Sequence, residues 1–239
     1  MDQPPPSPSS PLAALIVAAG PGVDTGLARL DPAAFDLVVA ADGGLDRALA
    51  RGIVPDLVVG DLDSVGAAAL AEARRLGARV VAHPRDKDET DLELALAAAI
   101  EAGAATATVV CDGGGRLDHA VANLCVLASP RWRRLALRAL VDEHEVHVVR
   151  TDRPCRLTLP PGARVSLLPV GGPATGVTTR GLRFALEGGR LEAWAGRGVS
   201  NEVVSSPVEV SVTAGVVLVV VGPVSASSTP TSDRPDARG

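Results

Sequence analysis

The sequence predicts a mixed α/β protein in which an N-terminal domain with a Rossmann-like parallel sheet is followed by a C-terminal all-β sandwich. In the first half, short apolar runs alternate with alanine-rich helical patterns, and continuous apolar runs joined by helices are typical of parallel strands buried on both faces. After about residue 150, short runs of Val, Leu and Thr are separated by Gly and Pro, and no helical period remains. This sequence pattern is typical of an antiparallel sandwich or barrel. We expect the domains to span residues 12–150 and 151–224.

The elements of the first half alternate between strand and helix along the chain. Strands are expected, in order, at LAALIVAA, DLVVAA, PDLVVG, RVVAH, TATVVC and LALRALV. Helices are expected at LDRALARG and over about residues 64–77, 90–103 and 118–128. In the second half, strands fall within CRLTLPPGARVSLLPVGG, GVTTRGLRFALEGGRLE and SSPVEVSVTAGVVLVVVG. Residues 1–11 and 225–239 are rich in Pro and Ser, and we expect both segments to be disordered.

Composition and charge exclude several classes of protein. The chain has 239 residues and a net charge of −5, and its basic residues are scattered, which argues against a nucleic-acid or membrane-surface partner. The three cysteines, Cys111, Cys125 and Cys155, form no CxxC motif, so neither a disulfide framework nor a zinc site is expected. The N-terminal residues lack the pattern of a signal peptide, and no apolar run reaches membrane-spanning length. We therefore expect a cytoplasmic protein.

Charged residues follow four consecutive predicted strands, and most of them are carboxylates. In chain order these residues are Asp42; Asp61 and Asp63; Asp86, Lys87, Asp88 and Asp91; and Asp112, Arg116, Asp118 and His119. Open parallel sheets bind their ligands at the carboxyl ends of the strands. So many like charges would raise the carboxyl pKa values and cost stability unless a cation neutralised them. The pattern therefore predicts a site that holds a metal cation.

The segment VVGDLDSV places two of these aspartates directly after a buried strand. In an extended chain, residues two apart point the same way, so Asp61 and Asp63 present both carboxylates to one side while Leu62 turns back to the core. Mg²⁺ takes a few carboxylate oxygens and completes its shell with water and phosphate oxygens, so the pair is a candidate magnesium site. The alternative is that Asp63 or Ser64 only caps the following helix. Four acidic strand ends together favour the metal site.

The segment GGGRLDH contributes groups that suit phosphate. Its glycines allow backbone N–H groups to approach phosphate closely, and the guanidinium of Arg116 is able to bind two phosphate oxygens at once. Lys87 adds a second cation. The sequence contains no GxxxxGK followed by Ser or Thr, so a P-loop is not predicted, and AAGPGVDTG does not match the GxGxxG fingerprint.

Aromatic residues are scarce in this chain. They are Phe35, Phe184, Trp132 and Trp194, and there is no tyrosine. The commoner role of such a side chain is to fill a gap in the core, but an aromatic ring outside the core is available to stack on a ligand.

Six motifs, in their order along the chain, resemble those of the thiamine pyrophosphokinase (thiamine diphosphokinase) family. They are ADGGLDRAL, PDLVVGDLDSV, DKDETDLELAL, GGGRLDHAVANL, GLRFAL and VSNEV, and the resemblance runs from about residue 12 to about residue 221. It implies an N-terminal α/β catalytic domain, a C-terminal β-sandwich, and a homodimer whose active sites lie between the catalytic domain of one subunit and the sandwich of the other. The implied reaction converts ATP and thiamine into thiamine diphosphate and AMP.

The resemblance also implies roles for individual residues. The acidic residues around ATP and Mg²⁺ would be Asp42, Asp61, Asp63, Asp88 and Asp91, with Asp61, Asp63 and Asp88 as metal ligands. The nucleotide and phosphate site would be completed by Lys87, Thr90, Arg116, Asp118 and His119. The residues implied to contact thiamine are Phe184, Ser200 and Asn201. The general base stays open between Asp63 and Asp91. The chain departs from the family in the loop after the first strand, where Ala18, Ala19 and Gly20 replace a common Asn-Gly pair.

Three other functions stay open from the sequence. A related diphosphokinase would transfer the diphosphoryl group to a hydroxymethylpterin, but the GLRF and VSNEV motifs have no reason to exist without thiamine. A non-catalytic nucleotide- or thiamine-binding sensor would keep Phe184 and Asn201 and lose part of the acidic set, all of which is present. In the third, the carboxylates only cap helices, and adding Mg²⁺ would not change thermal stability.

Overall fold

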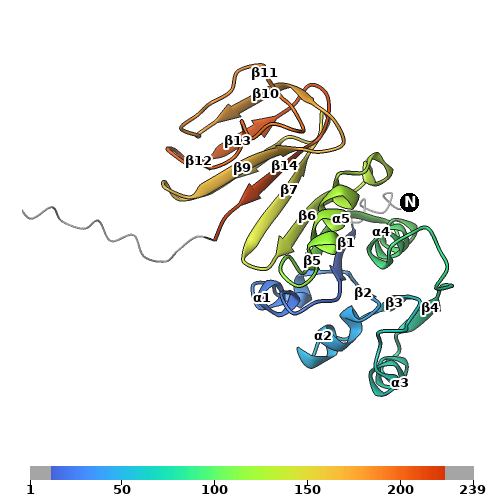
Figure 1. Cartoon of the computed structure of the whole chain (residues 1–239). Coiled ribbons are helices and arrows are strands. Elements are labelled where there is room, and N and C mark those ends of the chain that lie inside the picture. Colours follow the sequence, from blue (N-terminus) through green and yellow to red (C-terminus); the bar gives the residue numbers. More distant parts are fainter. Residues whose placement is uncertain (1–11, 224–239) are drawn as a thin grey trace, which may run out of the picture.

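The computed structural model describes residues 12–223, which form one ten-stranded sheet, one four-stranded sheet and five α-helices (Figure 1). The disorder expected for residues 1–11 and 225–239 concerns segments outside this range, and it stays a prediction. The expected fold class is confirmed: a parallel sheet with helices in the N-terminal half is followed by an antiparallel β-sandwich.

Six parallel strands make up the N-terminal part of the large sheet. They are β1 (Leu12–Val17), β2 (Leu37–Ala41), β3 (Leu57–Gly60), β4 (Arg79–Ala82), β5 (Ala104–Cys111) and β6 (Ala136–Val141). Their spatial order is β6-β5-β1-β2-β3-β4, and every neighbouring pair is parallel. Because β2 lies on one side of β1 and β5 on the other, the strand order reverses at β1. Such a topological switch point is where open α/β sheets bind ligands.

Helices cover both faces of these strands. They are α1 (Val23–Leu27), α2 (Gly44–Ala50), α3 (Ala67–Arg75), α4 (Asp91–Glu101) and α5 (Leu117–Ala128), with two short 3-10 helices, η1 (Pro32–Ala34) and η2 (Pro130–Trp132). Leu96 of α4 and Leu127 of α5 share an apolar cluster with Ile16 of β1. The adjacent Leu15 points to the opposite face and packs with Leu27 of α1. None of the helices formed by the described residues is long and apolar enough to cross a membrane.

Eight strands form the C-terminal half. They are β7 (His144–Val149), β8 (Cys155–Leu157), β9 (Arg164–Pro169), β10 (Ala174–Arg180), β11 (Gly189–Leu191), β12 (Asn201–Glu202), β13 (Val208–Ser211) and β14 (Val217–Val221). Strand β7 pairs antiparallel with β6 and with β14, and β9 and β12 follow, so the large sheet runs through both halves of the chain.

The C-terminal half is a sandwich because the second sheet, in the order β11-β10-β13-β8, packs on this end of the large sheet (Figure 1). Val149 and Leu167 from the large sheet share one apolar cluster with Val177 and Val210 from the small one. The domain boundary expected between residues 150 and 151 falls just after β7. The division into two domains stays a prediction.

Candidate active site

A cleft of about 540 Å³ opens at the carboxyl ends of the parallel strands, at the switch point of the sheet. Of the residues for which the sequence predicted a role in binding or catalysis, those that line it are Asp42, Asp61, Asp63, Thr90, Asp91, Asp118 and His119. The other lining residues are Ala18, Ala19, Ala41, Ser64, Leu92, Ala122 and Asn123. Most of the predicted acidic set is therefore gathered in one place.

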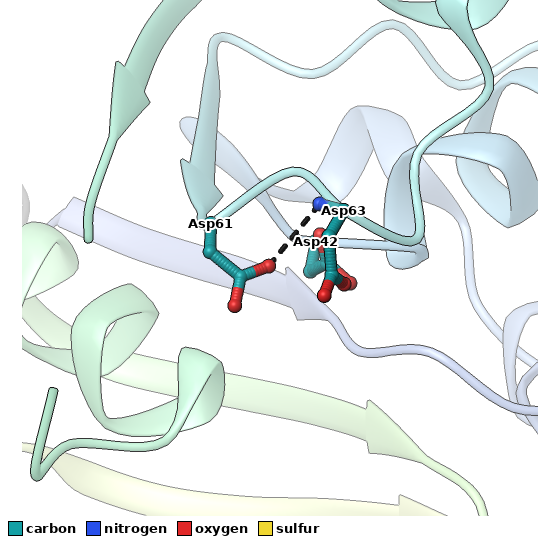
Figure 2. A group of neighbouring side chains, drawn as sticks. All are labelled: Asp42, Asp61 and Asp63. Atoms are coloured by element: carbon teal, nitrogen blue, oxygen red, sulfur yellow. Dashed lines mark hydrogen bonds between the residues drawn. The ribbon is translucent and has the colours of Figure 1, made fainter. Parts of the chain in front are cut away.

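Three carboxylates meet in this cleft (Figure 2). One oxygen from each of Asp42, Asp61 and Asp63 lies within 4.8 Å of the others. Asp42 is only 7 % exposed, and its Oδ1 accepts no hydrogen bond from the described residues. Its backbone has a φ of 45°, and its N–H donates to the carbonyl oxygen of Val59 at 2.8 Å, which fixes Asp42 against β3. Burial raises the pKa of Asp42, and the charge of the nearby Asp91 adds to the rise.

The carboxylates of Asp61 and Asp63 are brought together by a turn. Leu62 has a φ of 64°, and the N–H of Asp63 donates to Asp61 Oδ1 at 3.1 Å (Figure 2). The expectation of an extended chain at this point is therefore wrong, because an aspartate side chain readily binds the N–H group two residues on and favours a turn. Leu62 still packs against the core beside Leu45, as expected. The hydrogen bond from the Asp63 N–H is the largest cause that lowers the pKa of Asp61, and the charge of the Lys87 ammonium lowers it further.

Lys87 supplies a positive charge beside these carboxylates. Its Nζ lies 3.4 Å from Asp61 Oδ2 and 3.2 Å from Asp91 Oδ1, and its side chain is 12 % exposed. The contact with Asp91 is an ion pair without the angle of a hydrogen bond. Burial acts to lower the pKa of Lys87, but the carboxylates of Asp91 and Asp61 outweigh it, so the pKa is raised. Lys87 is therefore charged at neutral pH.

The neighbours of Lys87 have different surroundings. Asp88 is exposed and lies outside the group of three carboxylates found among the described residues, so its metal role stays a prediction. Thr90 is the N-cap of α4: its Oγ1 accepts the N–H of Glu93 at 3.3 Å, and Glu93 Oε2 accepts the N–H of Thr90 at 2.9 Å. This capping box fixes the start of α4, and hence the place where Asp91 enters the cleft.

Helix α5 forms another wall of the cleft. Asp118, His119 and Asn123 line it. Asn123 belongs to the motif GGGRLDHAVANL but was given no role from the sequence, although its spacing of four residues from His119 places both on one face of the helix. Arg116 lies just before the helix, and its Nη2 is 2.6 Å from Asp118 Oδ2. This hydrogen bond is the largest cause that lowers the pKa of Asp118. Both side chains are about two-thirds exposed, so this ion pair is weak and exchangeable.

The glycine loop after β5 is bound by carboxylates of the chain itself. Asp112 accepts the N–H of Gly115 at 2.7 Å and that of Gly22 at 2.8 Å, while Asp142 accepts the N–H of Gly113 at 3.2 Å. The expectation that this loop offers its N–H groups to phosphate is therefore wrong for Gly113 and Gly115. The carboxylate of Asp112 instead ties the loop after β1 to the loop after β5.

The residues expected to contact thiamine lie away from the cleft. Phe184 is 67 % exposed and Ser200 is also exposed, whereas Asn201 is buried, and the cleft is lined by none of the three. Asn201 is the first residue of β12, which lies at the edge of the large sheet, eight strand positions from β3 (Figure 1). At about 4.8 Å per position, the two places are on the order of 38 Å apart along the sheet.

Carboxylates and a charged lysine at the switch point of a parallel sheet are groups that suit an enzyme of the phosphotransferase type. Residues 33–139 match the family model for the catalytic domain of thiamin pyrophosphokinase, and residues 143–217 match the model for its vitamin B1 binding domain. The chain belongs to the thiamin pyrophosphokinase family. Membership confirms the expected enzyme, a thiamine diphosphokinase with ATP as co-substrate, and gives no support to the pterin and sensor alternatives.

Individual relatives agree with the family. The chain is 28 % identical over 196 residues to thiamine pyrophosphokinase 1 of Oryza sativa subsp. japonica, a match that covers 67 % of this chain and 70 % of the rice protein. It is 22 % identical over 194 residues to thiamine pyrophosphokinase of Bacillus subtilis (strain 168), covering 77 % and 86 % of the two chains. The crystal structure of a thiamin pyrophosphokinase family protein from Enterococcus faecalis has a TM-score of 0.75 at 23 % identity, over 89 % of this chain and 99 % of that chain. This likeness supports the fold.

Proposed function

We propose that the cleft binds ATP together with Mg²⁺, and that the C-terminal half of a second copy of the chain presents thiamine to it. The hydroxyl oxygen of thiamine attacks the β-phosphorus of ATP in line, the bond from that phosphorus to the α,β-bridging oxygen breaks, and AMP leaves. The hydroxyl proton passes to a carboxylate of the cleft. The observation that carries the proposal is the group of Asp42, Asp61 and Asp63, in which one buried oxygen has no partner among the described residues.

The three carboxylates suit a hard divalent ion. Mg²⁺ binds carboxylate oxygens and fills the rest of its shell with water and phosphate oxygens. Asp42, Asp61 and Asp63 would hold it, and the ion would satisfy the buried Oδ1 of Asp42. Asp42 replaces Asp88 in this ligand set, because Asp88 is exposed and outside the group. When bound, Mg²⁺ neutralises charge on the phosphate oxygens during transfer.

Cationic side chains of the chain are proposed to hold the phosphates. Lys87 is charged and largely buried, and it contacts Asp61 and Asp91, which line the cleft. Arg116 is exposed, and a phosphate oxygen would replace Asp118 as its partner at little cost. Catalysis then depends on positioning and electrostatics. Asp63 and Asp91 both line the cleft, and both stay candidates to accept the hydroxyl proton.

The separation of the two sites supports a homodimer with shared active sites. Counted along the sheet, a thiamine bound near Asn201 would be on the order of 38 Å from the carboxylates of its own chain, and such a separation disfavours direct transfer within one chain. We therefore propose that each cleft receives thiamine from the partner subunit. Leu117 and Val121 of α5, beside the cleft, are 77 % and 53 % exposed, and such a contact would cover them. Phe184 and Trp194 are exposed apolar side chains on the other half.

A mass-spectrometric product assay tests the reaction. Purified protein is incubated with ATP, Mg²⁺ and thiamine, beside a reaction with a hydroxymethylpterin and one with the Asp61→Asn variant. Thiamine diphosphate and AMP are expected in equal amounts with the wild-type chain only. Formation of ADP with thiamine monophosphate would overturn attack at the β-phosphorus, and a product with the pterin alone would overturn the acceptor.

A further inference from the structure

We propose that Asn201 is a positioning residue, which holds the backbone of Phe184 so that the exposed phenyl ring is presented to thiamine, and that Asn201 does not itself bind the substrate. The inference rests on the proposed function and on the contact with thiamine that the family resemblance implies for Phe184. It replaces the direct contact with thiamine that the sequence motif implied for Asn201.

The side-chain amide of Asn201 binds both polar backbone groups of one residue. The N–H of Phe184 donates to Asn201 Oδ1 at 3.0 Å, and Asn201 Nδ2 donates to the carbonyl oxygen of Phe184 at 2.9 Å. Oδ1 also accepts the N–H of Glu202 at 2.9 Å. A carboxamide offers two acceptor sites and two donors, so three of the four are used inside the chain. Because Asn201 is only 5 % exposed, little of its side chain is available to a ligand.

The loop that carries Phe184 depends on such a side chain. It joins β10 to β11, and the N–H and C=O of Phe184 have no backbone partner within residues 12–223. Two nearby residues of the loop are bound in other ways. The N–H of Arg183 donates to the carbonyl oxygen of Glu202 at 2.8 Å, and the N–H of Leu186 donates to Thr179 Oγ1 at 2.9 Å. The Asn201 amide therefore takes the place of a neighbouring strand for Phe184.

A fixed backbone matters because the exposed ring of Phe184 is held only weakly by packing against its own chain. The residue is 67 % exposed, although the chain has only four aromatic residues, and Trp132, in contrast, is almost fully buried. A ring on an ordered backbone loses little conformational entropy when it stacks on a ligand, whereas a ring on a free loop has to be ordered first. Thiamine is a cation with aromatic rings, which suits the face of a phenyl ring. Asn201 would raise the affinity for thiamine by this preorganisation.

A double-mutant cycle on the KM for thiamine tests the inference. The variants are Asn201→Ala, Phe184→Ala and the combination of both. Asn201→Ala is expected to raise the thiamine KM about tenfold, with kcat and the ATP KM within about twofold of wild type. In the Phe184→Ala background the same substitution is expected to change the thiamine KM by less than about twofold, because the ring through which it acts is gone.

Thr179→Val is the matched control. It removes one partly buried hydrogen bond to the same loop, at Leu186, and keeps the size of the side chain. The variant is expected to lower the melting temperature, although less than Asn201→Ala, which removes three hydrogen bonds, and to leave the thiamine KM within about twofold. An equal rise of the thiamine KM in this control would overturn the inference, since any loosening of the loop would then have the same effect.

The remaining outcomes are distinct. If Asn201→Ala raises the thiamine KM by the same factor in both backgrounds, Asn201 acts independently of Phe184, and the inference is overturned while the role of Phe184 stands. If Phe184→Ala leaves the thiamine KM unchanged, the proposed role of Phe184 fails and the inference fails with it. Should Asn201→Ala not fold, the isosteric Asn201→Asp takes its place under the same criteria, because it lacks the donor to the Phe184 carbonyl.

Discussion

Asp42 combines two properties that each disfavour a carboxylate at its position. It is buried, and its Oδ1 has no hydrogen-bond partner among the described residues. Burial penalises the charged form and raises the pKa of Asp42, and it outweighs the opposite effect of hydrogen bonds from Gly43 and Ser64. A bound cation would reverse this penalty. We therefore expect Asp42 to destabilise the folded chain when no metal is bound, and to contribute to the affinity for the cation when it is bound.

Asp42→Asn is predicted to stabilise the metal-free protein at neutral pH. The folded state binds the Asp42 proton more tightly than the unfolded chain does, so the destabilisation is complete above the raised pKa and disappears as the pH falls toward the ordinary value of 3.8. The variant should melt about 2–4 °C higher at pH 7, a shift that about 1 kcal/mol gives in a chain of this size. Melting in EDTA between about pH 8 and pH 4 should show this advantage shrinking. A constant advantage would contradict the assignment, as would equal stabilisation of both proteins by Mg²⁺.

Asp61→Asn and Asp63→Asn are each predicted to lower kcat at least about 100-fold, because each removes a charged group from the proposed metal site. Circular dichroism should show an unchanged fold, since both residues lie in a turn at the cleft and outside the core. Asp88→Asn is the comparison, because Asp88 is exposed and outside the group. A loss in this variant as large as in the other two would return Asp88 to the ligand set.

The pair of Asp61 and Asp63 also shows how far single residues could be predicted. Their position after a buried strand indicated that both carboxylates reach one site, and they do. The turn that brings them together depends on a left-handed Leu62, and leucine has no preference for that region that a sequence would reveal. The place of Asn201 under the Phe184 loop was hidden for a similar reason, because it depends on pairing between residues 17 positions apart.

At the scale of elements, α4 illustrates how a helix start sets the geometry of the cleft. Thr90 and Glu93 close a capping box, and Asp91 follows the cap directly. The hydroxyl of Thr90 is bound by Glu93 both as an acceptor and as a donor. Oγ1 accepts the N–H of Glu93 at 3.3 Å and donates to Glu93 Oε2 at 3.1 Å. We therefore expect Thr90 to act on the site through the helix start and to contribute little as a direct contact to nucleotide.

Thr90→Ala is predicted to lower the free energy of unfolding by about 1 kcal/mol, the usual effect of losing an N-cap hydroxyl. Thr90→Ser keeps the cap and should keep most of the stability. The measurement is urea denaturation of the three proteins, with the ATP KM measured alongside. A large rise of the ATP KM in Thr90→Ala without loss of stability would instead make Thr90 a direct nucleotide contact.

The helices and strands could be predicted where the pattern of apolar residues is regular over a long enough stretch of sequence. All six parallel strands and the helices α2 to α5 lie where the apolar runs and alanine-rich patterns indicated. Helix α1 was not expected, because its five residues lie in a segment with Gly and Pro and are too few to show a helical period. The spatial order of the strands was beyond reach as well, since it depends on pairings such as β14 with β7, far apart in the sequence.

At the scale of the whole molecule, the proposed dimer predicts complementation between two impaired variants. Asp61→Asn damages the cleft and Phe184→Ala damages thiamine binding. Random mixing makes half of the dimers mixed, and each mixed dimer contains one site with both parts intact, so about one quarter of wild-type activity should return at low thiamine. The activity of a mixture refolded together is compared with that of the two proteins assayed in one tube without exchange. No recovery after verified subunit exchange would place both parts of the site in one chain.

The sheet that runs unbroken through both halves of the chain limits how this enzyme can evolve. The first family match ends within β6 and the second begins just before β7, and in this strand pair Ala139 pairs with Val146 and Leu140 pairs with Glu145. A cut at this point would uncover two hydrogen-bonding edges, and bare edges recruit other chains into aggregates. The halves are therefore poor modules for recombination. A new acceptor specificity would have to evolve by substitution in surface loops, such as the one between β10 and β11, while the shared sheet is inherited as one piece.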